Sequence, residues 1–175
     1  MTAAMSIGRP TTQNQTGTGR FDAPNPASTP MVQLVDETGG RVVDPDFSPQ
    51  LKPAQAVGLL RDMARIRRFD TEATALQRKG QLGLWAPLLG QEAIQVGVRA
   101  ALGPADHVFP SHREHGLALL MGLPVERILA IFKGAEMGDW DAEQLRFHHY
   151  NMVIGAHTLH GVGYALGQGR DAATD

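Results

Sequence analysis

Residues 106–134 read DHVFPSHREHGLALLMGLPVERILAIFKG. Residues 107–110 predict a short extended segment, consistent with the end of a buried strand. A helix is predicted over 113–121, and a second one begins at Pro124 and ends where Lys133 is followed by a glycine. The stretch therefore predicts an extended segment that turns into two successive helices.

The turn before the first of these helices, PSHREHG at 110–116, is the candidate site. Ser111 and Glu114 have the S-x-x-E spacing of a capping box, which predicts Ser111 as the N-cap. Arg113 would then stand in the first helical turn, where free N–H groups and the helix dipole favour an anion such as phosphate. A guanidinium there could add paired, charge-assisted hydrogen bonds. The spacing alone slightly favours the simpler alternative, in which Arg113 pairs with Glu114 or another carboxylate.

Upstream of this turn the sequence predicts two helices. Apolar residues recur every three or four positions from Pro53 to a stop at 78–80, as on one face of a long amphipathic helix. The basic residues at 65–68 should lie mostly on its solvated side. A shorter helix is expected over 91–102. The apolar face of the long helix consists of Ala56, Leu59, Leu60, Met63, Ile66, Ala73 and Leu76.

The remaining segments define the organisation of the chain. Residues 1–30 are rich in small and polar residues and predict a disordered tail, which leaves 31–175 as the domain. Residues 32–43 predict a short hairpin around a glycine turn. Residues 134–150 show no clear period and are expected to form a loop. Small residues at helical spacing over 154–167 predict a helix that faces another subunit.

Composition limits the classes of function. A formal net charge of −2 and a pI near 6.4 provide no basic surface for a nucleic-acid backbone, so no nucleic-acid partner is expected. No window approaches the roughly 20 apolar residues of a membrane span, and the N-terminus lacks the pattern of a secretory signal. Cysteine is absent, which fits a reducing compartment. We therefore expect a cytoplasmic protein that does not enter a membrane.

Two further residue types leave alternatives open. Histidines are clustered at 112–115 and 148–160, and His157 and His160 have a spacing that can bind one metal ion, but no HExxH context surrounds them. Structural roles are therefore favoured, and no metal ligand is assigned. Trp85 either fills the core or lines a pocket. Neither a dinucleotide-binding glycine motif, a Walker loop nor a hydrolase elbow is present, so nothing indicates a self-contained nucleotide or hydrolase site.

Four segments in fixed order give the sequence a specific resemblance. FDTEATALQRKGQLGLW (69–85), LLGQEAIQVGVRAAL (88–102), the stretch 106–134 and FHHYNMVIGAHTLHGVGYALG (147–167) together resemble the alpha subunit of the first component (E1) of 2-oxo acid dehydrogenase complexes. That family includes the pyruvate and branched-chain enzymes. The resemblance implies an α/β thiamin diphosphate-binding fold. This chain would be its helix-rich N-terminal portion, lacking much of the parallel sheet.

The resemblance also implies four cofactor-binding residues. The family has Tyr-Arg where this chain has His112-Arg113, and both family residues contact the cofactor diphosphate. Arg113 keeps that role, while an imidazole N–H of His112 can donate to a phosphate oxygen. Met152 matches a backbone contact to the aminopyrimidine, and Ile154 matches the apolar residue that keeps the cofactor bent. This bend places the exocyclic amine beside the reactive thiazolium carbon.

Other parts of the active site are expected outside this chain. The resemblance places the Mg²⁺ ligands in a segment that begins Gly-Asp-Gly, expected beyond residue 175, and the catalytic histidine later still. The glutamate that activates the cofactor belongs to the beta subunit, so no catalytic residue is assigned here. The implied partners are a beta subunit, in an alpha2-beta2 tetramer, and a lipoyl-bearing acyltransferase.

The sequence favours pyruvate as substrate, with branched-chain 2-oxo acids as the alternative. Because the expected Mg²⁺ segment lies beyond residue 175, a fragment that is inactive alone is the expected state. Two alternatives come from other classes of protein. One is a truncated subunit that binds a beta partner without catalysis, and the other is a free-standing helical domain with a histidine metal site.

Overall fold

The computed structural model describes residues 32–45, 47 and 51–171. The predicted tail at 1–30 lies outside the described residues. Contacts divide the chain into two units, the smaller spanning residues 8–55 and the larger including 56–175. The site and its supporting core belong to the larger unit.

In the smaller unit, the predicted hairpin is confirmed around a glycine turn. Val35 and Arg41 form an isolated antiparallel bridge, and Gly39 has a φ of 85°. The Asp36 carboxylate accepts hydrogen bonds from the backbone N–H groups of Thr38 (2.8 Å) and Gly40 (2.7 Å). The hydrogen bond from the Thr38 hydroxyl, followed by these backbone bonds, lowers the pKa of Asp36. The turn is therefore held by one aspartate.

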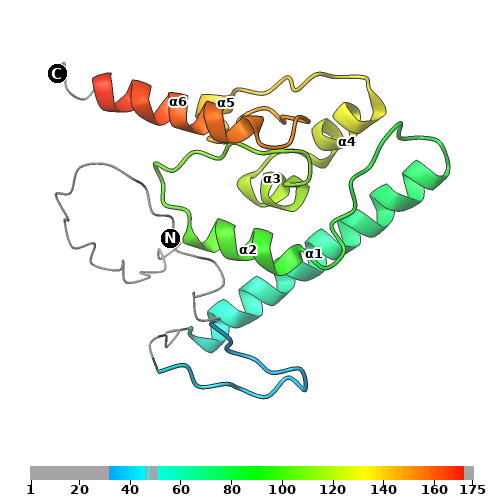
Figure 1. Cartoon of the computed structure of the whole chain (residues 1–175). Helices are drawn as coiled ribbons and strands as arrows, with labels where there is room; N and C mark the ends of the chain where they lie inside the picture. The colour runs from blue at the N-terminus through cyan, green and yellow to red at the C-terminus, as the bar shows by residue number, and fades with distance from the viewer. Residues whose placement is uncertain (1–31, 46, 48–50, 172–175) are drawn as a thin grey trace. The chain divides into compact units, whose positions relative to one another are not determined.

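Six helices are described, and Figure 1 labels them in chain order. The predicted helices are confirmed, and each of their ends lies within four residues of the predicted one. The short α5 lies in the segment predicted to be a loop, which corrects that prediction. The Asp141 side chain caps it by accepting the Gln144 N–H (2.9 Å), but a single turn is too short to show a helical period. The helices are α1 (Pro53–Arg78), α2 (Glu92–Ala101), α3 (His115–Met121), α4 (Val125–Lys133), α5 (Ala142–Leu145) and α6 (Ala156–Asp171).

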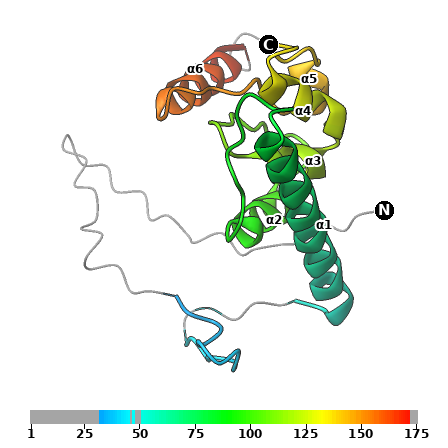
Figure 2. The same cartoon turned by 90° about the vertical axis from the view of Figure 1, so that its right-hand side faces the viewer.

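The core of the larger unit forms around α3. Both views show α3 between α2 and α4 (Figures 1 and 2). Leu117 and Ala118 of α3 are buried against Ile128 and Phe132 of α4 and Phe69 of α1. A smaller cluster joins α1 to α2 and consists of Ile66, Leu88 and Val96. This packing fixes the position of the turn that precedes α3.

The predicted face of α1 is only partly correct. Ile66 and Ala73 are buried as expected, but Leu60 is 65% exposed. Burial is concentrated between residues 66 and 73. Helical periodicity identifies which side of a helix is apolar, but it does not show how much of the helix length other elements cover.

A buried aspartate that the sequence analysis missed settles the role of Trp85. Trp85 is 4% exposed and fills the core between Phe69 and Phe132. Its indole N–H donates to Oδ1 of buried Asp70 (2.9 Å), and the Leu88 N–H donates to the same oxygen (2.8 Å). Asp70 therefore anchors the 80–90 loop to α1.

The prediction for the basic residues of α1 is confirmed, because Arg65, Arg67 and Arg68 are all exposed. One of them also forms an ion pair with a residue of α2. Arg67 binds the carboxylate of Glu92, which is almost fully buried at the start of α2. The hydrogen bond from Arg67 lowers the pKa of Glu92 against the opposing effect of burial. Glu92 also accepts the N–H of Gly90 (3.0 Å). Arg67 thus links α1 to α2 although its own side chain is 51% exposed.

Two extended segments pair in parallel beside the helices. The Val108 N–H donates to the Arg146 carbonyl (2.9 Å), and the His148 N–H donates to the Val108 carbonyl (2.8 Å). This isolated parallel bridge confirms the extended segment at 107–110, and no longer strand occurs in the described residues. None of the described helices has the length and apolar character that a membrane crossing requires.

Candidate functional site

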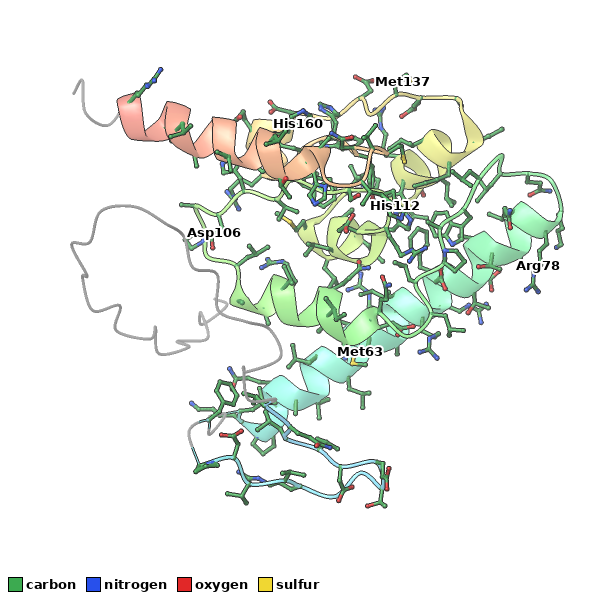
Figure 3. The ribbon with its side chains drawn as sticks, in the orientation of Figure 1. Met63, Arg78, Asp106, His112, Met137 and His160 are labelled. Atoms are coloured by element: carbon green, nitrogen blue, oxygen red, sulfur yellow. The ribbon has the colours of Figure 1, made fainter. Side chains whose placement is uncertain are left out.

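The structure brings together the two segments that the sequence analysis assigned to the cofactor. The Asn151 N–H donates to the carbonyls of Pro110 (3.2 Å) and Ser111 (3.1 Å). This contact holds His112-Arg113 next to the 152–154 segment at the start of α6. Figure 3 labels His112 near the centre of the larger unit.

The predicted capping box is wrong. α3 begins at His115, with Glu114 as its N-cap and no side-chain cap hydrogen bond. The carbonyl of an N-cap residue accepts the first bond of its helix, but the Ser111 carbonyl here accepts from Asn151 instead. Glu114 accepts the Arg113 N–H (3.1 Å), and the Ser111 hydroxyl contacts Nδ1 of His112 (3.1 Å). Arg113 therefore precedes the helix and does not lie in its first turn.

Gln95 of α2 holds the turn in place through two hydrogen bonds to its backbone, and the sequence analysis did not identify this residue. Its amide Nε2 donates to the Arg113 carbonyl (2.9 Å), and its Oε1 accepts the Leu117 N–H (2.8 Å). Gln95 is 6% exposed, so these bonds are shielded from water. A Cβ on Gly116 would lie 2.8 Å from Gln95 Oε1 and 2.8 Å from the Ile66 Cδ1, so only glycine fits here. A glutamine among the apolar residues of a helix was the signal available in the sequence.

The side chain of Arg113 has an unsatisfied buried donor. Its Nε is buried and has no hydrogen-bond partner among the described residues. In the part of the chain that the structure describes, no carboxylate forms an ion pair with the Arg113 guanidinium. The simpler alternative, a side-chain pair between Arg113 and Glu114 or another carboxylate, is therefore not found. A buried N–H without a partner costs about 1 to 3 kcal/mol. An anionic group bound at this turn would satisfy the donor.

The other predicted cofactor residues are more open. His112 is half-buried, Met152 is 46% exposed and Ile154 is 78% exposed. The side chain of Asn151 accepts the Val153 N–H (3.0 Å), which folds this segment into a turn before α6. The four assigned residues thus lie on either side of the hydrogen bonds between Asn151 and the carbonyls of Pro110 and Ser111. Ile154 is an exposed apolar side chain that a bound ligand or partner would cover.

Comparison with known proteins decides which family this site belongs to. Residues 61–174 match the family described as "Dehydrogenase E1 component", and this match covers more than half of the chain. The chain belongs to this E1 family. The family binds thiamin diphosphate. The resemblance stated from the sequence is therefore confirmed.

Relatives of this E1 chain include two kinds of enzyme subunit. It is 34% identical over 144 residues to the "3-methyl-2-oxobutanoate dehydrogenase subunit alpha" of Mycobacterium tuberculosis strain H37Rv, covering 78% of this chain and 39% of that protein. It is 33% identical over 136 residues to the "Pyruvate dehydrogenase E1 component subunit alpha" of Staphylococcus aureus strain N315, covering 78% of this chain and 36% of that protein. The chain thus spans well under half the length of these curated relatives.

Beside the turn, the E1 chain has a cavity of about 360 Å³ rich in histidine. The histidines of the 148–160 cluster line this cavity, but in the described residues they do not form one group with metal-ligand spacing. His160 instead contacts the Asn151 amide (3.4 Å). Among the described residues, the group with metal-ligand spacing is His107, Glu143 and His148, which includes only one of them. The cavity is lined by Phe109, Pro110, His148, His149, Tyr150, Asn151, His157 and His160.

His115, the other histidine of the turn, is part of the core of this E1 chain. It is fully buried, and its ring lies 4.5 Å from the ring centroids of both Trp85 and Phe132. Its Nδ1 lies 3.3 Å from the Tyr150 hydroxyl. Burial lowers the pKa of His115 to about 3, so the imidazole is neutral at physiological pH. It is not a cationic ligand for phosphate, and Arg113 is the cation of the turn.

Proposed function

We propose that this chain provides the diphosphate-binding part of the alpha subunit of a thiamin diphosphate-dependent pyruvate dehydrogenase E1 component. The observation that carries the proposal is the buried, unpaired Nε of Arg113, in a turn held against the 151–154 segment of a chain that belongs to the E1 family. Branched-chain 2-oxo acids are the alternative substrates, since relatives of both types are about equally similar.

The residues of the turn fit a diphosphate. Arg113 would donate from Nε and its terminal nitrogens to phosphate oxygens. The Ser111 hydroxyl can donate to Nδ1 of His112, and Nε2 of the same ring would then donate to a second phosphate oxygen. Gln95 fixes the Arg113 backbone through the carbonyl, so the guanidinium starts from a defined position.

The 152–154 segment would hold the organic part of the cofactor. The Met152 carbonyl would accept from the aminopyrimidine, and the Ile154 side chain would support its bend. Bound thiamin diphosphate would supply the centre that stabilises the negative charge left by decarboxylation. Mg²⁺ would bind with the diphosphate through residues outside this chain, and a beta subunit would complete the site. The acyl group would pass to a lipoyl-bearing acyltransferase.

Arg113→Ala is expected to raise the apparent KM for thiamin diphosphate at least tenfold in the purified alpha–beta complex that contains the complete alpha subunit. Loss of the charge-assisted bonds would cost about 1.4 kcal/mol or more. The measurement is the rate of 2-oxo acid oxidation as a function of cofactor concentration at saturating Mg²⁺. Arg68→Ala is the matched control, because Arg68 is an exposed arginine of α1 whose partner is Glu72. An unchanged KM in Arg113→Ala would refute this assignment.

Substrate choice is tested on the same complex. We expect a higher kcat/KM for pyruvate than for 3-methyl-2-oxobutanoate. The reverse order would replace the pyruvate assignment with the branched-chain one. Absence of activity with both substrates, despite bound cofactor and a beta subunit, would favour the non-catalytic subunit that the sequence left open.

A further inference from the structure

A cluster of metal-ligating side chains lies where α5 and α6 meet the parallel bridge. His107 comes directly before Val108 of the bridge, and His148 comes directly after its partner Phe147. Glu143 belongs to α5 and Tyr164 to α6, and these helices lie side by side in Figures 1 and 2. The bridge brings both histidines to the same place, although the sequence analysis placed only one of them among the clustered histidines.

The distances within this cluster suit a shared ion. Nδ1 of His107 lies 3.2 Å from Nε2 of His148. One ligand atom from each of His107, Glu143 and His148 lies within 4.8 Å of the others. Two nitrogens that bind one tetrahedral zinc ion at about 2.0 to 2.1 Å lie roughly 3.3 Å apart. The two imidazoles are therefore already at ligand–ligand distance.

Tyr164 holds the carboxylate and one histidine in place. Its hydroxyl donates to Oε2 of Glu143 (3.0 Å) and lies 3.2 Å from Nε2 of His107. If Nε2 of His107 donates to this hydroxyl, its Nδ1 presents a lone pair toward His148. A partner that fixes the second ring nitrogen of a metal-binding histidine is a usual feature of zinc sites. His107 is 16% exposed, so the cluster is partly shielded on one side and open on the side of Glu143.

We propose that Nδ1 of His107, Nε2 of His148 and the Glu143 carboxylate bind a zinc-class divalent ion. Oε2 of Glu143 lies 4.0 Å from the other ring nitrogen of His107, Nε2, so this exposed side chain turns toward the ion when the ion binds. The donor set of two imidazoles and one carboxylate matches zinc and leaves a fourth position for water. Without metal, the hydrogen between the two rings holds them together, and with metal the ion takes its place while His148 carries its hydrogen on Nδ1. The ion would tie α5 and the two bridge segments together, and Tyr164 would orient the ligands. This inference does not depend on the proposed cofactor role.

The test is a calorimetric titration of the chelator-treated 175-residue chain with ZnCl₂. One zinc ion per chain is expected, and Co²⁺ should give the intense visible absorption of a tetrahedral site. His148→Ala and Glu143→Gln are each expected to weaken zinc binding at least tenfold. Tyr164→Phe should weaken it less than either ligand substitution does, because Tyr164 only orients the ligands. His149→Ala is the matched control, since it removes the neighbouring exposed histidine that is not in the cluster.

Three results would overturn the proposal. They are the absence of zinc binding by the wild-type chain, a Glu143→Gln variant that binds zinc as tightly as wild type, and a His149→Ala variant that loses as much affinity as His148→Ala. The circular dichroism spectrum of each variant shows whether it is folded, so a lost zinc site can be distinguished from a lost fold. Glu143 is exposed and glutamine can still accept the Tyr164 hydroxyl, so a weakened zinc affinity with an unchanged spectrum supports the site.

Discussion

Asp70→Ala is expected to lower the free energy of unfolding by about 2 to 6 kcal/mol. The substitution removes the acceptor of two buried donors, the Trp85 indole N–H and the Leu88 backbone N–H. Each buried donor left without a partner costs about 1 to 3 kcal/mol. Because native stabilities are typically about 5 to 15 kcal/mol, a loss of this size can unfold the chain. Urea denaturation followed by circular dichroism measures it.

Two control variants isolate this effect. Asp70→Asn keeps a carbonyl oxygen that can accept both bonds, so it should lose less stability than Asp70→Ala. Asp62→Ala removes an aspartate of the same helix whose partner is the exposed Arg65, and exposed ion pairs contribute at most about 1 kcal/mol. If Asp70→Ala were no more destabilising than Asp62→Ala, the anchoring role of Asp70 would be wrong.

The second large effect is a loss of stability in mild acid caused by His115. Its pKa is about 3 in the folded chain, against 6.5 for the same group without burial. Between these two values the unfolded chain binds one more proton than the folded chain, so stability rises with pH over this interval. Above about pH 6.5 the neutral His115 does not lower the free energy of unfolding. Below it, the free energy of unfolding decreases by about 1.4 kcal/mol for each unit that the pH falls toward 3.

This pH dependence is measured by urea denaturation at several pH values between 7 and 4. His115→Gln, which cannot be protonated in this range, should show a slope smaller by about 1.4 kcal/mol per pH unit than wild type. His149→Gln, at an exposed histidine, should retain the wild-type slope. Equal slopes for wild type and His115→Gln would show that His115 is not held neutral in the core.

The helices of the larger unit could mostly be predicted from sequence, because their signals are local. Apolar periodicity and terminal glycines located α1 and α4, and the glycine after Lys133 takes the left-handed conformation expected of a helix stop. The start of α3 could not be predicted in the same way. It depends on Asn151, a residue distant in sequence, whose N–H donates to the Ser111 carbonyl that would accept the first bond of a helix capped by Ser111.

The candidate site shows the same division between local and distant causes. The residues alone identified Arg113 as a possible anion ligand but slightly favoured a structural role, and only the family resemblance indicated a diphosphate. Gln95, which supports the turn, and Asp70, which anchors the 80–90 loop, are buried polar residues whose partners are distant in sequence. Their importance follows from burial and hydrogen bonding, which no local spacing reveals.

The most direct test of the cofactor proposal is a calorimetric titration of the alpha–beta complex with thiamin diphosphate in the presence of Mg²⁺. The wild-type complex should bind one cofactor per alpha chain, and the chain without a beta subunit should bind it far more weakly. Arg113→Ala should weaken binding in the complex at least tenfold, while Arg68→Ala should not change it. Binding of equal strength by wild type and Arg113→Ala would contradict the proposal that this turn binds the diphosphate.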